Sequence, residues 1–574
     1  MRSAPAGVGR ALTKNLTAIV AALLISFSLI LFNPMLVYFS DPGRLGILPS
    51  RFVIQQLLVA TCVALGLALP VFKLGRRYAL ALVFGGLVVF FYSYVIQIGF
   101  GLFRGNRFSN EDALFETARL AYWIEPVGLV LAFLLVRLVF YRNRQFFAVF
   151  YAILLLTVGY EVASEANAYR LNQEWRNRRA LREPPKTLLR FSASQPNIVL
   201  FVPDAAAGYV VPQLMEENDR AARFDGFVNY RNTVSVGSYT MSSLAALIGG
   251  DRYFPDRINE RNDQTLSAHI KEAYNWLADT LRQHDYETTF VNPSFIKCAD
   301  IDHAGRCVES SKFKQGLESR SDIEPLEVFD EKSVLYFAAF KALPFSLKSA
   351  LYTSEGWKNR LDSDLQLAAS VNERFFEFLF LRALPRMSAI DEQDRSQFIH
   401  LWSPQLIAPF NLNEGCEPLA AGRDQLYSND ARTDSTRCLL DALSGWFDWM
   451  KANGVYDNTK IIIAADHGSD DYGQRWHVGA ANPMLMVKDF RRRGRLETSG
   501  IVLQNSDVAA LICSALGGCP QIKRDPVQHP IPNRTARYFH TGRGNKHWAT
   551  ANRQFDIIEV YEVQGDVREH PDLQ

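Results

Sequence analysis

Hydrophobic and polar positions divide this chain into two unlike parts. The first 165 residues contain recurrent apolar runs, at about 16–38, 52–72, 78–102, 120–140 and 146–162. Most of these runs are long enough to cross a hydrocarbon layer of about 30 Å as a helix, and the last is the shortest. A cleavable signal peptide is disfavoured, because the first run is long and further runs follow closely. The pattern therefore predicts a membrane domain, residues 1–165, with five transmembrane helices.

Basic residues indicate how these helices are oriented. They precede the first run and occupy the connections between the second and third runs and between the fourth and fifth: Arg2, Arg10, Lys14, Lys73, Arg76, Arg77, Arg142 and Arg144. Loops rich in Lys and Arg stay in the cytoplasm, so the amino terminus and the even-numbered loops are expected there. An odd number of spans then places everything after residue 165 on the outer side. Glu125, just before Pro126, is a candidate functional acid at membrane depth.

The rest of the chain alternates between strand-like and helix-like runs. Residues 166–195 are polar and predict a partly helical linker, and residues 561–574 form a tail. Between them, strands are predicted at 197–202, 287–291, 397–402, 460–465 and 484–488, and helices at 265–284, 362–383, 432–453 and 505–517. Such alternation predicts an α/β domain, residues 196–560, with a mostly parallel sheet flanked by helices. The amphipathic segment Val334–Leu351 is compatible with contact to the bilayer or with burial in the core.

Charge and cysteine content bear on the partners of this chain and on its cellular compartment. The formal net charge is +2, so the chain has no global field that indicates nucleic acid as a partner. Six of the seven cysteines lie in the globular part, in close sequence pairs. This indicates three disulfides and an oxidising compartment. We expect the pairs 298–307, 416–438 and 513–519, although six cysteines allow 15 pairings and buried free thiols are the alternative.

Polar residues that end two of the predicted strands form the candidate site. The run Ile461–Ala465 reads as a strand buried on both faces and ends in Asp466-His467-Gly468. Asp204 ends the first strand in the same way. Open α/β sheets bind ligands at the carboxyl ends of their strands. A carboxylate beside an imidazole suits zinc or manganese better than calcium. Gly468 is expected to let the chain turn sharply away.

Hydroxyl residues at a predicted helix start add a candidate nucleophile. Ser238 and Thr240 lie where a helix begins, and unpaired backbone N–H groups at such a position favour a phosphate-like anion. A hydroxyl is a poor nucleophile unless a metal or a base activates it. The alternative is that both side chains only cap the helix, which such residues commonly do.

Four segments in fixed order carry a family resemblance. They are Asn-Ile-Val-Leu-Phe-Val-Pro-Asp at 197–204, Thr-Met-Ser-Ser-Leu at 240–244, Phe-Ile-His-Leu-Trp-Ser-Pro at 398–404 and Asp-His-Gly at 466–468. Together they resemble the sulfatase-like branch of the alkaline phosphatase superfamily. With the membrane spans in front, the layout resembles the membrane-anchored phosphoethanolamine transferases and lipoteichoic acid synthases of bacterial envelopes.

The resemblance implies a site and a reaction. One divalent ion, zinc or manganese, would be held by Asp204, Thr240, Asp466 and His467, and Thr240 would be the catalytic nucleophile. Thr240 would take a phosphoryl head group, phosphoethanolamine or phosphoglycerol, from a membrane phospholipid donor and pass it to a glycan or lipid acceptor. His477 would contact the substrate phosphate. The protein would be a multi-pass protein of the bacterial inner membrane with its catalytic domain on the periplasmic side.

Departures from the family pattern keep other functions open. The transferases usually have Glu where this chain has Asp204, and Gln405 stands where a second histidine is common. His400, inside a predicted strand, is expected to be structural. One alternative is a membrane-bound, sulfatase-like hydrolase of phosphate or sulfate esters, although the Cys/Ser-x-Pro-x-Arg motif of arylsulfatases is missing near 235–245. The other alternative is a scaffold that has kept the fold without catalysis.

Overall fold

The chain folds into two compact units. The structure is a computed structural model that describes residues 6–40, 49–95, 103–104, 107–108, 111–182, 187–310, 338–348, 351–353, 356–357, 360–419, 423–469, 478–520, 522, 525–542, 546–570 and 573. The helical unit consists of Met1–Arg178 together with Pro325–Asn372, and the globular unit consists of Arg179–Glu324 together with Glu373–Gln574. A segment from the middle of the sequence therefore belongs to the helical unit.

Long apolar helices form most of the helical unit. In chain order they are α1 (Ala6–Phe27), α2 (Asn33–Ser40), α3 (Pro49–Ala68), α4 (Val71–Phe90), α5 (Glu111–Arg142) and α6 (Arg144–Arg182), with π-helical turns at Ser28–Phe32 and Phe91–Val95. Among the described residues, four stretches are long and apolar enough to cross a membrane, namely Asn15–Leu36, Val71–Val95, Ala121–Arg142 and Arg144–Asn167. The second predicted span corresponds to α3, whose apolar part Val53–Ala68 is shorter. A membrane protein is thus supported, whereas the number five stays a prediction.

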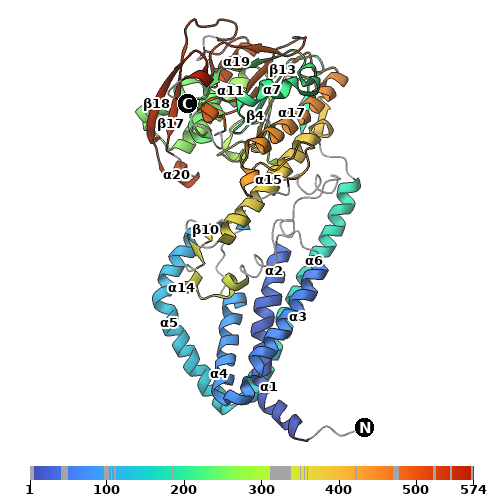
Figure 1. The fold of residues 1–574 in the computed structure, drawn as a ribbon, viewed down its shortest axis with the longest axis vertical. Coiled ribbons are helices and arrows are strands. Elements are labelled where there is room, and N and C mark those ends of the chain that lie inside the picture. The colour runs from blue at the N-terminus through green and yellow to red at the C-terminus, as the bar shows by residue number, and fades with distance from the viewer. Residues whose placement is uncertain are drawn as a thin grey trace. The chain divides into compact units, whose positions relative to one another are not determined.

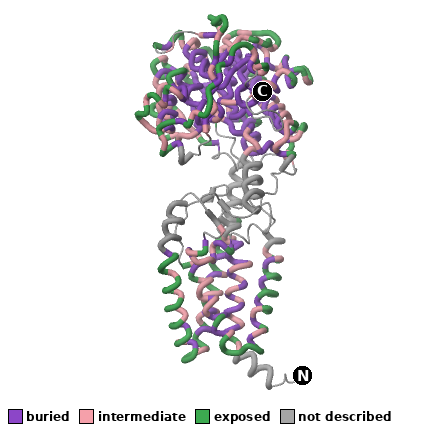
Figure 2. Tube along the Cα trace, turned by 60° about the vertical axis from the view of Figure 1, so that its left-hand side comes forward, coloured by how far each residue is buried: buried purple, intermediate pink, exposed green. Residues whose placement is uncertain are grey.

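Apolar side chains on the outside of these helices agree with a lipid environment. Leu58, Leu138 and Leu156 are 63%, 70% and 74% exposed. Figure 2 colours much of the helical unit as exposed or intermediate, while the interior of the globular unit is buried. A side chain of this size loses about 1.5–3 kcal/mol of burial free energy when it faces water, and a hydrocarbon phase removes that cost.

Glu125 caps a short helix within the helical unit. Its carboxylate accepts hydrogen bonds from the backbone N–H groups of Phe345 and Ser346, at 2.8 and 2.9 Å, and from the Ser346 hydroxyl at 2.6 Å. These two residues begin α14 (Phe345–Lys348), so the acid satisfies N–H groups that a helix start leaves unpaired. The described part of the amphipathic segment 334–351 therefore docks against α5 through a residue that the sequence singled out.

An eight-stranded sheet organises the globular unit. Its strands are β15 (Glu497–Ser499), β5 (Phe227–Tyr230), β14 (Leu485–Lys488), β13 (Thr459–Ala464), β4 (Asn197–Pro203), β12 (Gln397–Ser403), β7 (Glu287–Val291) and β8 (Arg306–Val308), in this spatial order. The five strands from β13 to β8 are all parallel. Only β14 runs against its neighbours β13 and β5. The predicted mostly parallel sheet is confirmed.

Helices cover both faces of this sheet, and alternate residues of each central strand point to opposite faces. Ile198, Leu200 and Val202 of β4 pack with α9 (Thr240–Gly249), α11 (Leu266–Gln283) and α19 (Asp507–Ala515). Val199 and Phe201 pack with α7 (Val211–Glu216), α17 (Asn429–Ala452) and the end of α15 (Arg360–Met387). Figure 1 shows α11 and α19 on one side of β4, with α7 and α17 on the other. Burial on both faces explains why these strands are continuously apolar.

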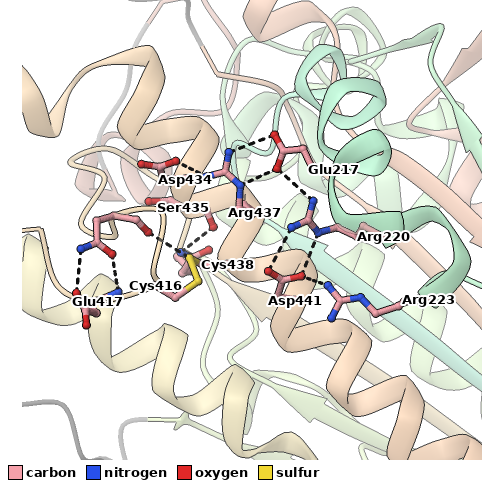
Figure 3. Close-up of a disulfide and its surroundings, with 12 residues drawn as sticks. Glu217, Arg220, Arg223, Cys416, Glu417, Asp434, Ser435, Arg437, Cys438 and Asp441 are labelled. Atoms are coloured by element: carbon pink, nitrogen blue, oxygen red, sulfur yellow. Dashed lines mark hydrogen bonds and ion pairs between the residues drawn. A yellow bond between two sulfur atoms is a disulfide. The ribbon is translucent and has the colours of Figure 1, made fainter.

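Ion pairs and a disulfide hold α17 in place. Arg437 donates to Glu217 at 2.8 Å, and Arg220 donates to Asp441 at 3.0 Å. These contacts tie the middle of α17 to the turn Glu217–Asp219 and to α8 (Arg220–Arg223), as Figure 3 shows. Hydrogen bonding to Arg437 lowers the pKa of Glu217. The disulfide between Cys416 and Cys438 joins α17 to the preceding loop. Because α17 leads into β13, these contacts also restrain the strand that precedes Asp466.

The cysteine pairing and most of the predicted elements agree with the structure. Disulfides join 298 to 307, 416 to 438 and 513 to 519, as expected, and the remaining cysteine, Cys62, is free. Helix α6 extends from the last apolar run to Arg182, within the segment 166–195 that was predicted as a partly helical linker, and the linker itself stays a prediction. The prediction missed β5 and the hairpin of β17 (Thr535–Thr541) and β18 (Ile557–Gln564). On β18, exposed apolar residues such as Ile558 obscure the alternation that predicts a strand.

Candidate metal centre

Strand register brings the two predicted acids together. β4 and β13 are adjacent and parallel, with Phe201 opposite Ile463. Asp204 and Asp466 each follow three residues later, so both lie at the same edge of the sheet. Both are buried: their side chains are 3% and 0% exposed. The Asp466 carboxylate also accepts from the backbone N–H of Ala205 at 3.3 Å. The sheet therefore places two carboxylates side by side in its interior.

Thr240 lies against this acid pair. It is the first residue of α9, and Tyr239 precedes the helix in an extended conformation. The Thr240 hydroxyl oxygen lies 3.3 Å from each carboxylate oxygen of Asp204 and 3.3 Å from Nε2 of His467. The hydroxyl of Ser238 instead accepts from the backbone N–H of Thr541 at 3.3 Å. The hydroxyl of Thr240 thus points to Asp204 and the imidazole of His467 rather than back to cap its own helix.

The ring of His467 is oriented by its own backbone. Nδ1 lies 2.6 Å from the carbonyl oxygen of Gly468, so this nitrogen carries the proton and donates it. The other nitrogen, Nε2, lies 3.4 Å from Asp204 and 3.8 Å from Asp466 and is the ring atom available to a metal. Histidines that bind metals are commonly fixed by such a hydrogen bond from the second ring nitrogen.

The chemistry of these residues fits a divalent cation. Ligand atoms from Asp204, Asp466 and His467 all lie within 4.8 Å of one another. Oδ2 of Asp466 is buried and has no hydrogen-bond partner among the described residues. Burial, and next the charge of Asp466, raise the pKa of the Asp204 carboxyl well above its usual range. A cation would pair with both carboxylates and relieve their repulsion, and two oxygens with one imidazole suit zinc or manganese.

Close backbone packing shapes the turn after His467. A Cβ atom on Gly468 would lie 1.9 Å from the carbonyl oxygen of Gly479 and 2.8 Å from that of Asn482. The backbone N–H of Gly468 donates to the carbonyl of Ala480 at 2.9 Å. Gly468 is not among the positive-φ glycines, so the turn here does not depend on a left-handed backbone conformation. This position requires glycine because α18 (Val478–Ala481) approaches its backbone directly.

The structure describes His400 but not His477, the other histidine considered for the site. His477, the predicted phosphate contact, lies outside the described residues, and its role stays a prediction. His400 is fully buried in β12, with Nε2 3.4 Å from the Tyr274 hydroxyl, as expected for a structural residue. Gln405 is also fully buried, and its amide donates to the carbonyl of Ser435 at 3.4 Å.

Several buried polar residues around the site were not anticipated. Arg432 of α17 donates to the carbonyl of Ser469 at 3.4 Å and stacks over Tyr209 at 5.1 Å. Ser235 and Asn505 contact the carbonyl oxygen of Asp466 from two other segments. Single serines and asparagines outside any motif give no sequence signal, because their importance depends on which backbone group they meet in the fold.

No protein-family model and no curated protein matches this chain, but solved structures do. One is an alkaline phosphatase superfamily protein from Vibrio parahaemolyticus, 14% identical, with a TM-score of 0.37 over 64% of this chain and 81% of that one. Its solved neighbours thus include a member of the alkaline phosphatase superfamily.

Two other similar structures are the lipoteichoic acid synthase LtaP from Listeria monocytogenes and a phosphonate monoester hydrolase from Silicibacter pomeroyi. The first is 12% identical, with a TM-score of 0.31 over 58% of this chain and 76% of that one. The second is 14% identical, with a TM-score of 0.35 over 60% and 80%. With TM-scores below 0.5, these likenesses do not assign a reaction to this chain, and the function must be argued from the site.

Proposed function

We propose that this protein is a metal-dependent phosphotransferase that moves the head group of a membrane phospholipid, phosphoethanolamine or phosphoglycerol, to an envelope glycan or lipid. Thr240 is the nucleophile and carries the head group as a phospho-threonine. Asp204, Asp466 and His467, together with Thr240, hold one zinc or manganese ion. In this proposal the globular unit faces the periplasm and the apolar helices span the bacterial inner membrane.

One observation carries the proposal. The Thr240 hydroxyl oxygen lies 3.3 Å from the Asp204 carboxylate and 3.3 Å from Nε2 of His467, although these residues are 36 and 227 positions away in sequence. A helix cap or a surface turn has no need for a hydroxyl between a buried acid and an imidazole. A nucleophile does, because neighbouring groups must lower the pKa of the hydroxyl before it can attack.

Two displacements make up the proposed reaction. In the first, Oγ1 of Thr240 attacks the donor phosphorus, and the bond from phosphorus to the diacylglycerol oxygen breaks. The hydroxyl proton of Thr240 is released to solvent, and the departing oxygen takes one up, which yields diacylglycerol. In the second, an acceptor hydroxyl attacks phosphorus, the bond to Oγ1 breaks, and Thr240 regains a proton as the acceptor loses one.

The residues of the chain supply position and electrostatics for both steps. When bound, the metal would lower the pKa of the hydroxyl and offset negative charge on the phosphoryl oxygens. The start of α9 directs backbone N–H groups toward the same place, which favours an anion there. The Nδ1 hydrogen bond to Gly468 keeps Nε2 of His467 directed inward. Burial leaves the carboxylates of Asp204 and Asp466 little room to rotate.

The membrane helices support a lipid donor over a soluble one. Four stretches in the described part of the chain are long and apolar enough to span a bilayer, which would keep the globular unit close to its lipid substrate at all times. A hydrolase of phosphate or sulfate esters could use the same threonine with water as the acceptor. The transferase and the hydrolase differ in what they release when no acceptor is present, so the products formed without an acceptor distinguish them.

Trapping the intermediate tests this function. The purified full-length protein, loaded with zinc or manganese in lipid nanodiscs, is mixed with phosphatidylethanolamine or phosphatidylglycerol, quenched and digested. Mass spectrometry should find the head group on the peptide that contains Thr240, with one diacylglycerol formed per head group. Thr240→Ala should abolish both products, and Thr240→Ser should retain part of the activity.

Thr280→Ala is a matched control. Thr280 is similarly buried in α11, and its hydroxyl donates to the backbone carbonyl of Trp276 at 2.7 Å. This variant should label Thr240 normally. If neither phospholipid labels Thr240, the transferase proposal is wrong. Steady release of phosphate or head group without an acceptor would instead identify a hydrolase.

A further inference from the structure

A single buried amide links the nucleophile segment to the metal-ligand segment. Asn505 lies between β16 (Leu503–Gln504) and α19, and it is 1% exposed. Its Oδ1 accepts a hydrogen bond from the backbone N–H of Val236 at 2.9 Å. Its Nδ2 donates to the backbone carbonyl of Asp466. One rigid, planar group therefore contacts the chain four residues before Thr240 and at Asp466 itself.

Ser235 reinforces the same connection. It is fully buried, and its hydroxyl lies 3.0 Å from the Asp466 carbonyl oxygen and 2.7 Å from that of Gly237. The amide of Asn505 lies 3.5 Å from this hydroxyl. The backbone carbonyl of Asp466 is thus held by two side chains from two different segments, neither of which belongs to the sheet.

Movement of the segment 235–237 would be passed on to Thr240. A Cβ atom on Gly237 would lie 2.2 Å from the Ser242 hydroxyl and 2.8 Å from the Ser242 backbone. The segment therefore packs directly against the first turn of α9, which begins at Thr240. A shift of Val236 relative to Asp466 must change the distance between the Thr240 hydroxyl and the acids.

We infer that Asn505 is a positioning residue that sets the separation between Thr240 and the metal ligands. The side chain is not among the proposed metal ligands and acts through the two backbone groups that it bridges. Asparagine suits this place, because it offers an acceptor to Val236 and a donor to Asp466 from the same short side chain. This inference rests on the proposed roles of Thr240 and Asp466.

Asn232 offers a matched control for a purely structural asparagine. It is 3% exposed, and its amide donates to the backbone carbonyl of Gly565 at 2.6 Å and accepts from the N–H of Val567 at 2.8 Å. It therefore has the same residue type, burial and kind of partners as Asn505. Its bonds, however, tie the chain to the carboxyl-terminal segment rather than to Asp466.

The test compares Asn505→Ala, Asn505→Asp and Asn232→Ala in the full-length protein. The variant Asn505→Asp keeps the hydrogen-bond acceptor for Val236 but places an oxygen against the Asp466 carbonyl. It should therefore impair the site at least as much as Asn505→Ala. Affinities for Zn²⁺ and Mn²⁺ are measured by chelator competition, together with kcat, KM for the phospholipid and the midpoint of thermal unfolding. We expect both Asn505 variants to lose about 10- to 100-fold in kcat and in metal affinity, with KM unchanged.

Asn232→Ala should lower the unfolding midpoint to a similar extent and leave kcat and metal affinity at the wild-type level. Should the Asn505 variants fail to fold, Ser235→Ala serves in their place. It removes one hydrogen bond and should lose about fivefold in kcat and in metal affinity. Wild-type kcat and zinc affinity in the folded Asn505→Ala variant would overturn the inference.

The two proposals fail in distinguishable ways. If Thr240→Ala keeps full activity, the proposed function itself is wrong. If Thr240→Ala is inactive and Asn505→Ala resembles wild type, only the positioning role of Asn505 is wrong.

Discussion

Gly468→Ala tests whether close backbone packing at residue 468 is needed to keep His467 in position at the site. The new Cβ atom would lie 1.9 Å from the Gly479 carbonyl oxygen, about 1.5 Å short of an ordinary contact of about 3.4 Å. The obstacle is backbone, so no side-chain rotation can make room. Either the turn that carries His467 or the short helix α18 must move by roughly that distance.

The expected cost follows from the size of this displacement. Overpacking a buried position costs about 1–3 kcal/mol of unfolding free energy. A misplacement of about 1 Å in a catalytic site can cost about 100-fold in rate. Because His467 directly precedes the substituted residue, we expect kcat and zinc affinity to fall by about 100-fold, with a folded protein remaining.

The assay pairs this variant with Gly445→Ala. Gly445 is an exposed residue of α17 at which an added Cβ atom would have no neighbour within 4 Å. There, alanine should raise stability by about 0.5–1 kcal/mol, because glycine weakens a helix interior. Zinc affinity, kcat and thermal unfolding are measured for both variants. Wild-type zinc affinity and kcat in Gly468→Ala would refute the argument from close approach.

Two further predictions concern buried titratable groups. Burial lowers the pKa of His400 to about 3, so between pH 6.5 and that value only the unfolded chain takes up this proton. Stability should therefore fall by about 1.4 kcal/mol per pH unit as the pH drops through this window. Between pH 4.5 and 7, the unfolding free energy of His400→Phe should depend on pH less steeply than that of the wild type, by the equivalent of one bound proton. An unchanged slope would contradict the assignment. Arg534 donates to both carboxylate oxygens of the buried Asp507, at 2.5 and 2.8 Å. Arg534→Met should lower the unfolding free energy by about 3 kcal/mol by leaving that charge unpaired, and Arg534→Met combined with Asp507→Leu should recover much of the loss in chemical denaturation.

The sequence alone determined the features that depend on local patterning. Apolar runs of membrane-spanning length predicted the helical unit, and uninterrupted branched residues predicted strands such as Thr459–Ala464. The strand β7 was predicted with its observed ends. Asp204 and Asp466 could be singled out because each ends such a strand. Close spacing in sequence was enough to pair the six cysteines correctly.

Only the tertiary structure decided how these pieces meet. The antiparallel placement of β14, the need for glycine at 468 and the bridge formed by Asn505 all depend on backbone groups that are distant in sequence. A strand carries the same residues whichever way its neighbour runs, and a buried amide looks like any other asparagine until its partners are known. Periodicity reports which face of an element is buried. Hydrogen-bond partners and close backbone contacts are set by the packing of the whole unit, and this packing brings Thr240 to Asp204 and His467.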